Sequence, residues 1–291
     1  MSKQRKRRQR PRKNRITEPE TQVDIVMPVY GQPEFLLACL ASFFDHDPGI
    51  SYTLNLVDDQ SPETHRLAPI LDYAQEKGAR VVKHRRNKGF AATCNTGAAL
   101  GSAPWILLLN TDTLILNDGW LKAMVDAGRN PRVAVVGALL TFFETATDWA
   151  PASPIRPAGK VQHAGVVFDI LGRPYHIFVG WDPDHPKVNQ TREMNCVTGA
   201  CFLTRRHAWR RIGGLDEDYT RGNFEDVNYC LIARTLGYKV VFTPEVHLSH
   251  YAGGSGNSMT ADRNARLFQL KAGHLVVYDE WRFWQQRQNA R

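Results

Sequence analysis

The sequence predicts an α/β protein whose mostly parallel sheet is flanked by helices. Three observations indicate this class. Short β-rich apolar runs alternate with segments of helical periodicity along the first part of the chain. The run at residues 106–109 is continuously apolar, as in strands that are covered on both faces. The 291 residues are 43% hydrophobic, so the chain can form a large core and is too apolar to be disordered throughout.

The alternation can be followed element by element through the first half. The apolar run at residues 23–29 predicts a strand, and Pro33 followed by Leu36, Leu40 and Phe43 at helical spacing predicts a helix. Further strands are expected at residues 54–57, 81–82 and 105–109, and the helices between them at residues 62–77 and 91–100.

The second half is less regular. We expect a helix at residues 119–127, a strand at 133–138, a pocket-shaping loop at 141–160, a strand near Val166, a helix at 224–235 and a strand at 239–242. A long helix is predicted over residues 260–288, docked on the core or on a second subunit, which would make a homodimer. The domain prediction is a basic tail over residues 1–20, one domain over 21–256 and a C-terminal helical extension over 257–291.

The positive charge belongs to the amino-terminal tail. Residues 1–15 hold nine Lys or Arg and no acid, so the net charge of +8 becomes −1 for the remainder of the chain. Such a segment cannot bury apolar surface and is expected to be disordered. It is either a solubilising extension or a contact for anionic membrane lipid or nucleic acid, and charge alone does not choose among these.

Cysteine usage and apolar run length predict the compartment. The five cysteines are an odd number without a CxxC pair, which predicts neither a disulfide framework nor a zinc ribbon. No apolar run approaches the roughly 20 residues that span a bilayer. We therefore expect a cytoplasmic protein, with the inner membrane face as one surface that the tail could reach.

Polar side chains directly follow two predicted strands. Asp58 and Asp59 come after one of them, and Asn110, Thr111 and Asp112 after another. Ligands of open parallel sheets bind outside the carboxyl ends of the strands, so these side chains are candidates for function. The alternative is that they cap helices or turns, and for Asp59 capping is an equal alternative.

An oxygen-rich edge of this kind suits Mn²⁺ or Mg²⁺ bound to a diphosphate. The sequence has no GxxxxGK[ST] loop and no GxGxxG after the first strand, which argues against P-loop and dinucleotide chemistry.

Seven segments then resemble one family in its own order. They are PVY at 28–30, VDDQS at 57–61, NKGFAATCNTG at 87–97, LLLNTDT at 107–113, TGACFL at 198–203, GGLDEDY at 213–219 and FEDVNYC at 224–230. Together they resemble family 2 glycosyltransferases with the GT-A fold, a Rossmann-like single domain, and in particular the rhamnosyltransferase-like branch. The resemblance covers roughly residues 23–255.

The resemblance implies a donor site. The residues that line the nucleotide base would be Pro28, Val29 and Tyr30. Asp58 matches the Asp that accepts a hydrogen bond from the pyrimidine imide. Asn87 and Gly89 match the segment that approaches the nucleotide, where glycine permits close backbone contact. Thr198, Gly199 and Ala200 match a tight segment beside the donor sugar.

The resemblance also implies a metal site. The triplet that begins at Asn110 occupies the DxD position, whose last Asp, here Asp112, coordinates the metal on the diphosphate. Asn110 replaces the first Asp and brings no negative charge, so the site needs another ligand. His250 matches a late histidine of the family that can reach the metal, and His247 is the competing choice.

The remaining requirement is a base, because the acceptor hydroxyl must lose its proton as it attacks. Asp226 matches the family's base, and Glu225 is its supporting neighbour. An acidic start to a helix is the alternative explanation of this pair. His163 is a further candidate for contact with an acceptor, although core packing is the more common role of such a residue.

These inferences predict an inverting glycosyltransferase that moves a sugar from a UDP- or dTDP-sugar to a hydroxyl of a glycan or lipid-linked acceptor. A sugar-phosphate nucleotidyltransferase is disfavoured because the chain has no GxGTR loop after its first strand. The alternative from another class is a catalytically silent GT-A scaffold that presents its basic tail to nucleic acid or an anionic surface.

Overall fold

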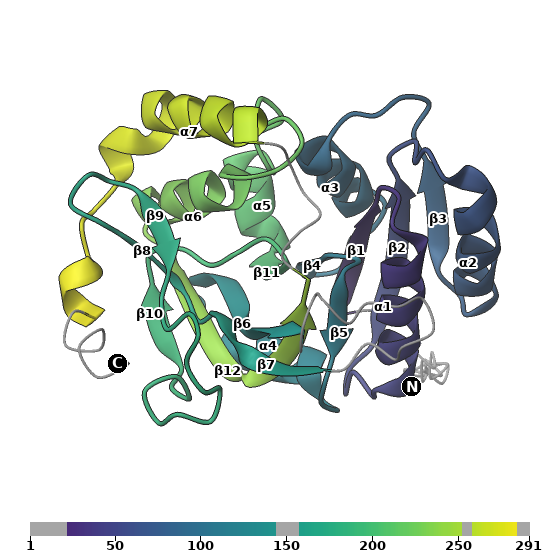
Figure 1. Cartoon of the computed structure of the whole chain (residues 1–291), viewed down its shortest axis with the longest axis horizontal. Helices are drawn as coiled ribbons and strands as arrows, with labels where there is room; N and C mark the ends of the chain where they lie inside the picture. The colour runs from purple at the N-terminus through teal and green to yellow at the C-terminus, as the bar shows by residue number, and fades with distance from the viewer. Residues whose placement is uncertain (1–21, 144–156, 252–257, 284–291) are drawn as a thin grey trace, which may run out of the picture.

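A computed structural model describes residues 22–143, 157–251 and 258–283 of the chain. Its centre is a ten-stranded sheet in the order β10-β12-β6-β11-β4-β1-β2-β3, with β5 paired to β12 and β7 paired to β6 (Figure 1). Helices cover both faces of this sheet. The α/β class and the mostly parallel sheet are confirmed.

The amino-terminal half of the sheet is parallel throughout. Strands β3 (Arg80–Lys83), β2 (Tyr52–Asp58), β1 (Val23–Val29) and β4 (Trp105–Leu109) lie side by side in that order. Their carboxyl ends therefore meet at one edge, and Asp58 and Asn110 stand at this edge.

The other half of the sheet is mixed. Strand β11 (Cys201–Arg205) runs antiparallel to both β4 and β6 (Val133–Phe143), and β12 (Lys239–His250) runs parallel to β6. The remaining strands are β5 (Thr113–Ile115), β7 (Pro157–His163) and β10 (Arg192–Met194), with β8 (Val166–Phe168) and β9 (Pro174–His176) forming a separate hairpin. Because β11 is reversed, residues just before it, and not after it, reach the edge where β4 ends.

Each face of the sheet has its own apolar core. On one face pack α1 (Pro33–Asp45), α2 (Thr64–Glu76) and α4 (Trp120–Ala127). On the other pack α3 (Phe90–Ala99), α5 (Arg206–Ile212), α6 (Glu225–Thr235) and α7 (Ser258–Ala272). The side chain of Trp120 is fully buried in the first core, and those of Tyr229 and Phe268 are buried in the second.

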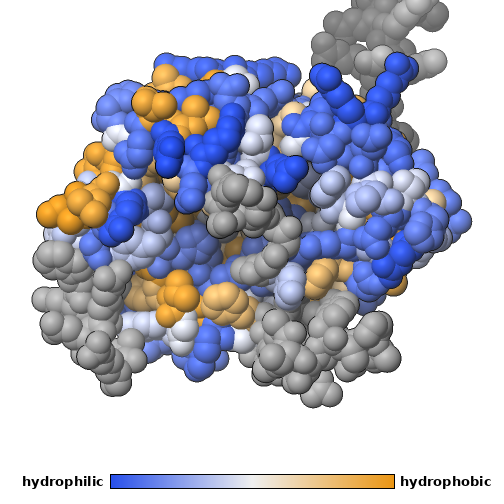
Figure 2. Space-filling model, turned by 45° about the horizontal axis from the view of Figure 1, so that its top comes forward, coloured by the Kyte–Doolittle hydropathy of each residue, from blue (hydrophilic) through white to orange (hydrophobic). Residues whose placement is uncertain are grey.

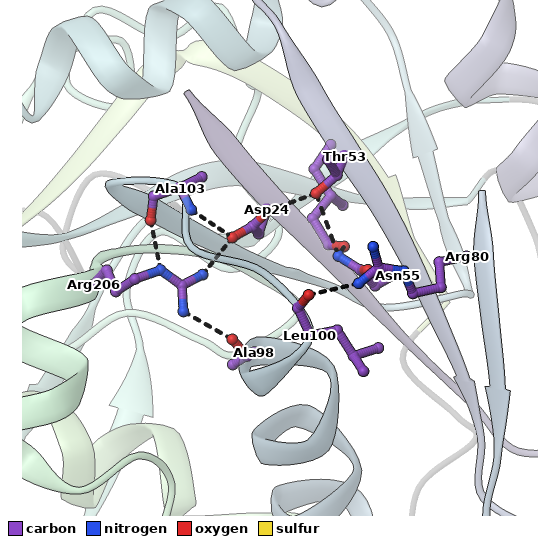
Figure 3. A network of polar contacts seen from close by, with 9 residues as sticks. Asp24, Thr53, Asn55, Arg80, Ala98, Leu100, Ala103 and Arg206 are labelled. Carbon is purple, nitrogen blue, oxygen red and sulfur yellow. Dashed lines mark hydrogen bonds and ion pairs between the residues drawn. The ribbon is translucent and has the colours of Figure 1, made fainter. Parts of the chain in front are cut away.

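A buried ion pair ties these layers together at the start of β1, away from the carboxyl edge (Figure 3). Arg206 Nη2 lies 2.5 Å from Asp24 Oδ2, and the same guanidinium donates to the carbonyls of Ala98 and Ala103. Thr53 Oγ1 donates to the other oxygen of Asp24. The network joins two neighbouring strands to α3 and α5, so its role is structural.

The expected long C-terminal helix is wrong. Helix α7 ends at Ala272, a 3-10 turn at Gly273–Leu275 follows, and a second one lies at Glu280–Phe283. Beyond the helix, Asp279 Oδ1 accepts a hydrogen bond from the backbone N–H of Phe168, which holds this segment against β8 and away from a continued helix. Residues 284–291 lie outside the described part.

Two strands are longer than predicted, and some elements were not predicted. Strand β6 runs into the expected loop at 141–160, β7 begins at its end, and β12 continues to His250. Buried Thr141 and Ser249 face each other across β6 and β12, so polar residues that suggested a loop pair inside the sheet. The strand expected near Val166 is β8, whereas helix α5 and strands β5, β9, β10 and β11 were missed.

The remainder of that loop, residues 144–156, and the basic tail lie outside the described residues. Among the helices of the described ranges, none has the length and apolar character needed to cross a bilayer. Figure 2 shows apolar groups on the left half of one face, the side that carries α7 and the C-terminal segment in Figure 1. A homodimer through this segment stays a prediction.

Candidate active site

The ends of β1 and β2 form the first part of the candidate site. Asp58 is 1% exposed, with Oδ1 accepting the N–H of Ser61 at 2.8 Å and Oδ2 lying 3.1 Å from Lys83 Nζ. Ser61 Oγ in turn accepts the N–H of Gly31 at 2.9 Å. Both oxygens of Asp58 are therefore engaged, and a nucleobase would have to share Oδ2 with Lys83.

The segment predicted to line the base lies beside this network. Val29 is fully buried, so it can offer only its backbone, whereas Tyr30 is 56% exposed at the edge of the sheet. Pro28 is half-buried at the end of β1. Of the three residues, Tyr30 alone presents a large surface to solvent.

Asp59 shapes the loop that carries Asn87 and Gly89. Its carboxylate accepts the N–H groups of Lys88 and Gly89, both at 2.8 Å, and its Oδ1 lies 2.7 Å from Nδ1 of buried His84. Gly89 has a φ of 89°, and a Cβ there would lie 3.3 Å from the backbone nitrogen of Arg221. Asp59 is thus a loop-forming residue, the capping alternative that the sequence left open.

The second part of the site follows β4. The N–H of Asn110 donates to the carbonyl of Ala200 at 2.9 Å, which joins the DxD segment to the residues before β11. The amide oxygen Oδ1 of Asn110 is buried and has no hydrogen-bond partner within the described part of the chain. Asp112 Oδ1 lies 3.2 Å from His250 Nε2.

The proton on His250 can be assigned from its neighbours. The carbonyl oxygen of His250 can only accept, so the Gln162 atom 3.0 Å from it must be the amide nitrogen. The amide oxygen of Gln162 then faces His250 Nδ1 at 2.7 Å and accepts its proton. In the neutral imidazole, Nε2 therefore carries a lone pair, and this lone pair faces the carboxylate of Asp112.

Two lone pairs that face each other repel, and a cation bound between them would remove this repulsion. Octahedral Mg²⁺ holds its ligands at about 2.1 Å, so adjacent ligands lie about 3 Å apart, close to the observed Asp112–His250 separation. Within the described part of the chain, no group of three or more His, Cys, Asp or Glu is placed to hold a metal ion. The two residues fit an ion that also takes ligands from a diphosphate and water, and the unpartnered Asn110 oxygen adds a polar atom beside them.

His247 lies in a different polar cluster. Its Nε2 is 3.0 Å from Thr141 Oγ1, and its N–H donates to Asn117 Oδ1. Burial lowers the pKa of this imidazole, so it is neutral at pH 7. Of the two candidate histidines, His250 is the one at Asp112.

The third part of the site is the start of α6. Asp226 Oδ2 accepts the N–H of Gly199 at 2.7 Å, and Oδ1 accepts the N–H of Val227. A Cβ on Gly199 would lie 3.4 Å from the Cβ of Asp226, so the backbone before β11 runs directly against this side chain. Burial raises the pKa of Asp226, but the residue keeps some solvent exposure.

Glu225 has a different environment from its neighbour. It is 4% exposed, its Oε2 has no partner among the described residues, and burial followed by the charge of Asp226 raises its pKa well above the ordinary value. These surroundings favour the protonated form of the Glu225 carboxyl, so Glu225 is less suited than Asp226 to exchange a proton with an acceptor.

Two more histidines lie between the Asp112–His250 pair and Asp226. His163 Nε2 accepts the N–H of Thr198 at 3.4 Å, and its ring centroid lies 4.7 Å from that of His176. His176 Nδ1 donates to the backbone carbonyl of Gln162 at 3.1 Å. Burial is the largest cause that lowers the pKa of both imidazoles, so both are neutral at pH 7.

These contacts bring the predicted residues of the second half together. Asp112 is connected through His250, Gln162, His176 and His163 to Thr198, whose neighbour Gly199 donates to Asp226. The residues predicted to line the nucleotide base lie at the ends of the adjoining strands. Gln162 and His176 were missed by sequence reasoning, although the polar pair Gln162–His163 beside apolar residues was an available signal.

Comparison with protein families gives a match to the Glycosyl transferase family 2 model over residues 24–213. The match therefore includes the predicted donor residues and Asp112. Asp226 and His250 lie beyond it.

Two curated proteins are similar to most of the chain. Protein y4gI of Sinorhizobium fredii (strain NBRC 101917 / NGR234) is 27% identical over 84% of this chain and 26% of its own length. The O-antigen biosynthesis protein RfbC of Myxococcus xanthus is 30% identical over 80% of this chain and 17% of its own length. The chain thus spans about a quarter or less of the length of these relatives.

Two solved structures share the fold. A structure of GalNAc-T7 with UDP, GalNAc and Mn²⁺ aligns with a TM-score of 0.66 at 16% identity, over 86% of this chain and 48% of that one. The mannosyltransferase PcManGT of Pyrobaculum calidifontis, in complex with GDP-Man and Mn²⁺, aligns with a TM-score of 0.56 at 15% identity, over 88% and 64% of the two chains. At these identities the likeness concerns the GT-A fold.

Proposed function

Because this chain belongs to glycosyl transferase family 2, we propose that it moves a sugar from a nucleotide-diphosphate donor to a hydroxyl group of a glycan or lipid-linked acceptor. The donor is a UDP- or dTDP-sugar, and the anomeric carbon is inverted in a single displacement. One observation carries the proposal: Asp112 with His250, and Asp226, are far apart in sequence and border the same sheet edge through a continuous set of contacts.

The donor binds along the parallel half of the sheet. Tyr30 offers its ring to the base, and the loop held by Asp59 brings the backbone at Gly89 toward the nucleotide. Asp58 contributes a carboxylate beside Lys83. The small residues Thr198, Gly199 and Ala200 leave room for the donor sugar.

Asp112 and His250 hold Mn²⁺ or Mg²⁺ together with oxygens of the diphosphate. The ion supplies positive charge where the leaving diphosphate gains negative charge. Both solved structures named above contain Mn²⁺, which supports the choice of a divalent cation.

Asp226 accepts the proton of the acceptor hydroxyl. As this oxygen forms its bond to the anomeric carbon, the bond from that carbon to the diphosphate oxygen breaks, and the hydroxyl proton passes to the carboxylate of Asp226. The N–H groups of Gly199 and Val227 fix the carboxylate in place. Its raised pKa makes it a stronger base than an exposed aspartate.

The acceptor is proposed from a relative. RfbC is named as an O-antigen biosynthesis protein, which supports a glycan or lipid-linked glycan as acceptor here. We further propose, from the cysteine usage and apolar run lengths of the sequence, that the reaction takes place in the cytoplasm, at the inner membrane face. The basic tail as a contact for anionic lipid or nucleic acid remains a prediction.

Thermal unfolding with nucleotide and metal tests the proposal. UDP or dTDP with Mn²⁺ should raise the melting temperature, because a ligand at 100 times its Kd stabilises the folded state by about 2.7 kcal/mol. That corresponds to roughly 5–10 °C for a domain of this size. Removal of residues 1–15 should leave the shift unchanged. The absence of any shift with either nucleotide would favour the silent scaffold.

A further inference from the structure

The orientation of the proposed metal ligand His250 depends on one side chain from another strand. Gln162 lies on β7 and is 5% exposed. Its amide contacts His250 twice: Oε1 accepts from Nδ1 at 2.7 Å, and Nε2 donates to the backbone carbonyl at 3.0 Å. The second contact prevents the amide from exchanging its two ends, because a carbonyl cannot donate.

This arrangement selects one of the two neutral forms of the imidazole. With the proton on Nδ1, the Nε2 lone pair points at Asp112 Oδ1, 3.2 Å away. With the proton on Nε2, the same atom would donate to Asp112 and have no lone pair for an ion. Gln162 therefore determines whether Asp112 and His250 can bind a cation between them or form a hydrogen bond with each other instead.

We propose that Gln162 is a positioning residue that keeps His250 in the metal-binding tautomer. The proposal rests on the proposed function, because it concerns the ion that Asp112 and His250 would hold there. Hydrogen bonds from the second nitrogen of a ligating histidine are worth 10- to 100-fold in metal affinity.

Gln162 also contacts the side of the site that carries Asp226, the proposed general base. The backbone carbonyl of Gln162 accepts the Nδ1 proton of His176, whose ring lies against His163. The side chain of Gln162 thus serves the Asp112 side, and its main chain serves the Asp226 side. A substitution of the Gln162 side chain removes its contacts with His250 and leaves its backbone carbonyl in place for His176. The two roles can therefore be tested separately.

Titration of Mn²⁺ into the full chain, followed by electron paramagnetic resonance with and without UDP, tests this role. Gln162→Leu should weaken Mn²⁺ binding 10- to 100-fold. Gln162→Glu should lose less affinity than Gln162→Leu, because a carboxylate oxygen still accepts the Nδ1 proton although it cannot donate to the His250 carbonyl. Gln75→Leu, on the exposed side of α2, is the matched control and should bind as the original chain does.

A second measurement reads the tautomer without any metal. Nitrogen-15 NMR of the neutral imidazole should place the proton of His250 on Nδ1 in the original chain and on Nε2 in Gln162→Leu. Gln162→Met, closer in length to glutamine, replaces the leucine variant if that chain does not unfold cooperatively.

The outcomes separate this inference from the proposed function. Unchanged Mn²⁺ affinity in Gln162→Leu, equal losses in the Leu and Glu variants, or an Nε2 proton in the original chain would overturn the role of Gln162 alone. An original chain that binds no Mn²⁺ even with UDP would overturn the metal site and this inference together.

Discussion

Glu225 and Asp226 are adjacent in the chain and differ in what surrounds them. The carboxyl of Glu225 is enclosed and has an oxygen without a partner, whereas Asp226 accepts two backbone N–H groups and reaches solvent. The sequence shows only two adjacent acids, and the structure separates them: burial and the charge of Asp226 raise the pKa of Glu225, whereas two backbone N–H groups oppose the effect of burial on the pKa of Asp226.

The raised pKa of Glu225 makes stability depend on pH. In the folded chain this carboxyl holds its proton above its ordinary pKa of 4.5, so its stability contribution is full below that value and is lost as pH rises toward the folded pKa. Glu225→Gln should reduce the decline of the unfolding free energy above about pH 5 by up to 1.4 kcal/mol per pH unit. Urea unfolding at a series of pH values measures this, and an unaltered slope would contradict the assignment.

Exchanging each proposed reactive carboxylate for an amide should give two different defects. Asp226→Asn is expected to keep the Mn²⁺-dependent binding of UDP and to lower transfer at least 100-fold, since a general base contributes about 10²–10⁴. Asp112→Asn is expected to weaken that binding. Calorimetry and a sugar-transfer assay measure the two effects, with exposed Asp72→Asn as the control. Equal loss of nucleotide binding in both variants would refute the separate roles.

Among the helices, α7 has a role that its position near the chain end does not suggest. The loop before α6 contains three non-glycine residues with positive φ, namely Arg221 at 60°, Asn223 at 79° and Phe224 at 75°. Asn264, fully buried on α7, donates its amide to the carbonyls of Thr220 and Gly222 at 3.0 and 2.8 Å. The helix thereby holds the strained turn that presents Asp226.

Loss of this amide should loosen the turn. Asn264→Ala leaves buried carbonyls without a donor, so the unfolding free energy should fall by about 1–3 kcal/mol, and transfer should fall more than nucleotide binding does. Denaturant unfolding and the two functional assays measure this. Arg266→Ala, exposed on the same helix, should change neither, and an equal effect of both variants would show that the amide has no special role.

Regular strands and helices could be predicted from the sequence, and those shaped by distant contacts could not. Strand β4 is a continuous apolar run, β1 and β2 are apolar at most positions, and α1 has apolar residues at helical spacing, so local patterns were sufficient. Strand β12 was expected to end at Phe242 because polar residues follow, yet Ser249 pairs with Thr141 inside the sheet. A pairing across about a hundred residues leaves no local signal.

The same distinction holds in the candidate site. Asp58 and Asp112 follow predicted strands, so their position in the fold identified them as candidates, whereas Asp226 was identified through the family resemblance. Gln162 and His176 became visible only when β7 and β9 were placed beside the end of β12. The role of Asp59 as a loop-forming residue needed the actual contacts with Lys88 and Gly89.

For the entire fold, the Asp24–Arg206 network predicts a large effect on stability. Asp24→Asn leaves a buried guanidinium without its carboxylate, which should cost about 3–5 kcal/mol of unfolding free energy. The double variant Asp24→Leu with Arg206→Met should recover much of this. Asp126→Asn, which breaks an exposed ion pair with Lys122, is the control and should cost under about 1 kcal/mol. Equal costs in the two single variants, read from urea unfolding, would contradict the structural role.

The reversed direction of β11 has a consequence for how such chains can diversify. The chain leaves the candidate site after β7, passes through the hairpin and β10, and returns to the same edge just before β11. This excursion begins and ends beside the reacting groups without crossing β1, β2 or β3. Insertions or replacements within it would change the surface beside Asp226 and leave the strand ends that carry Asp58 and Asp112 in place.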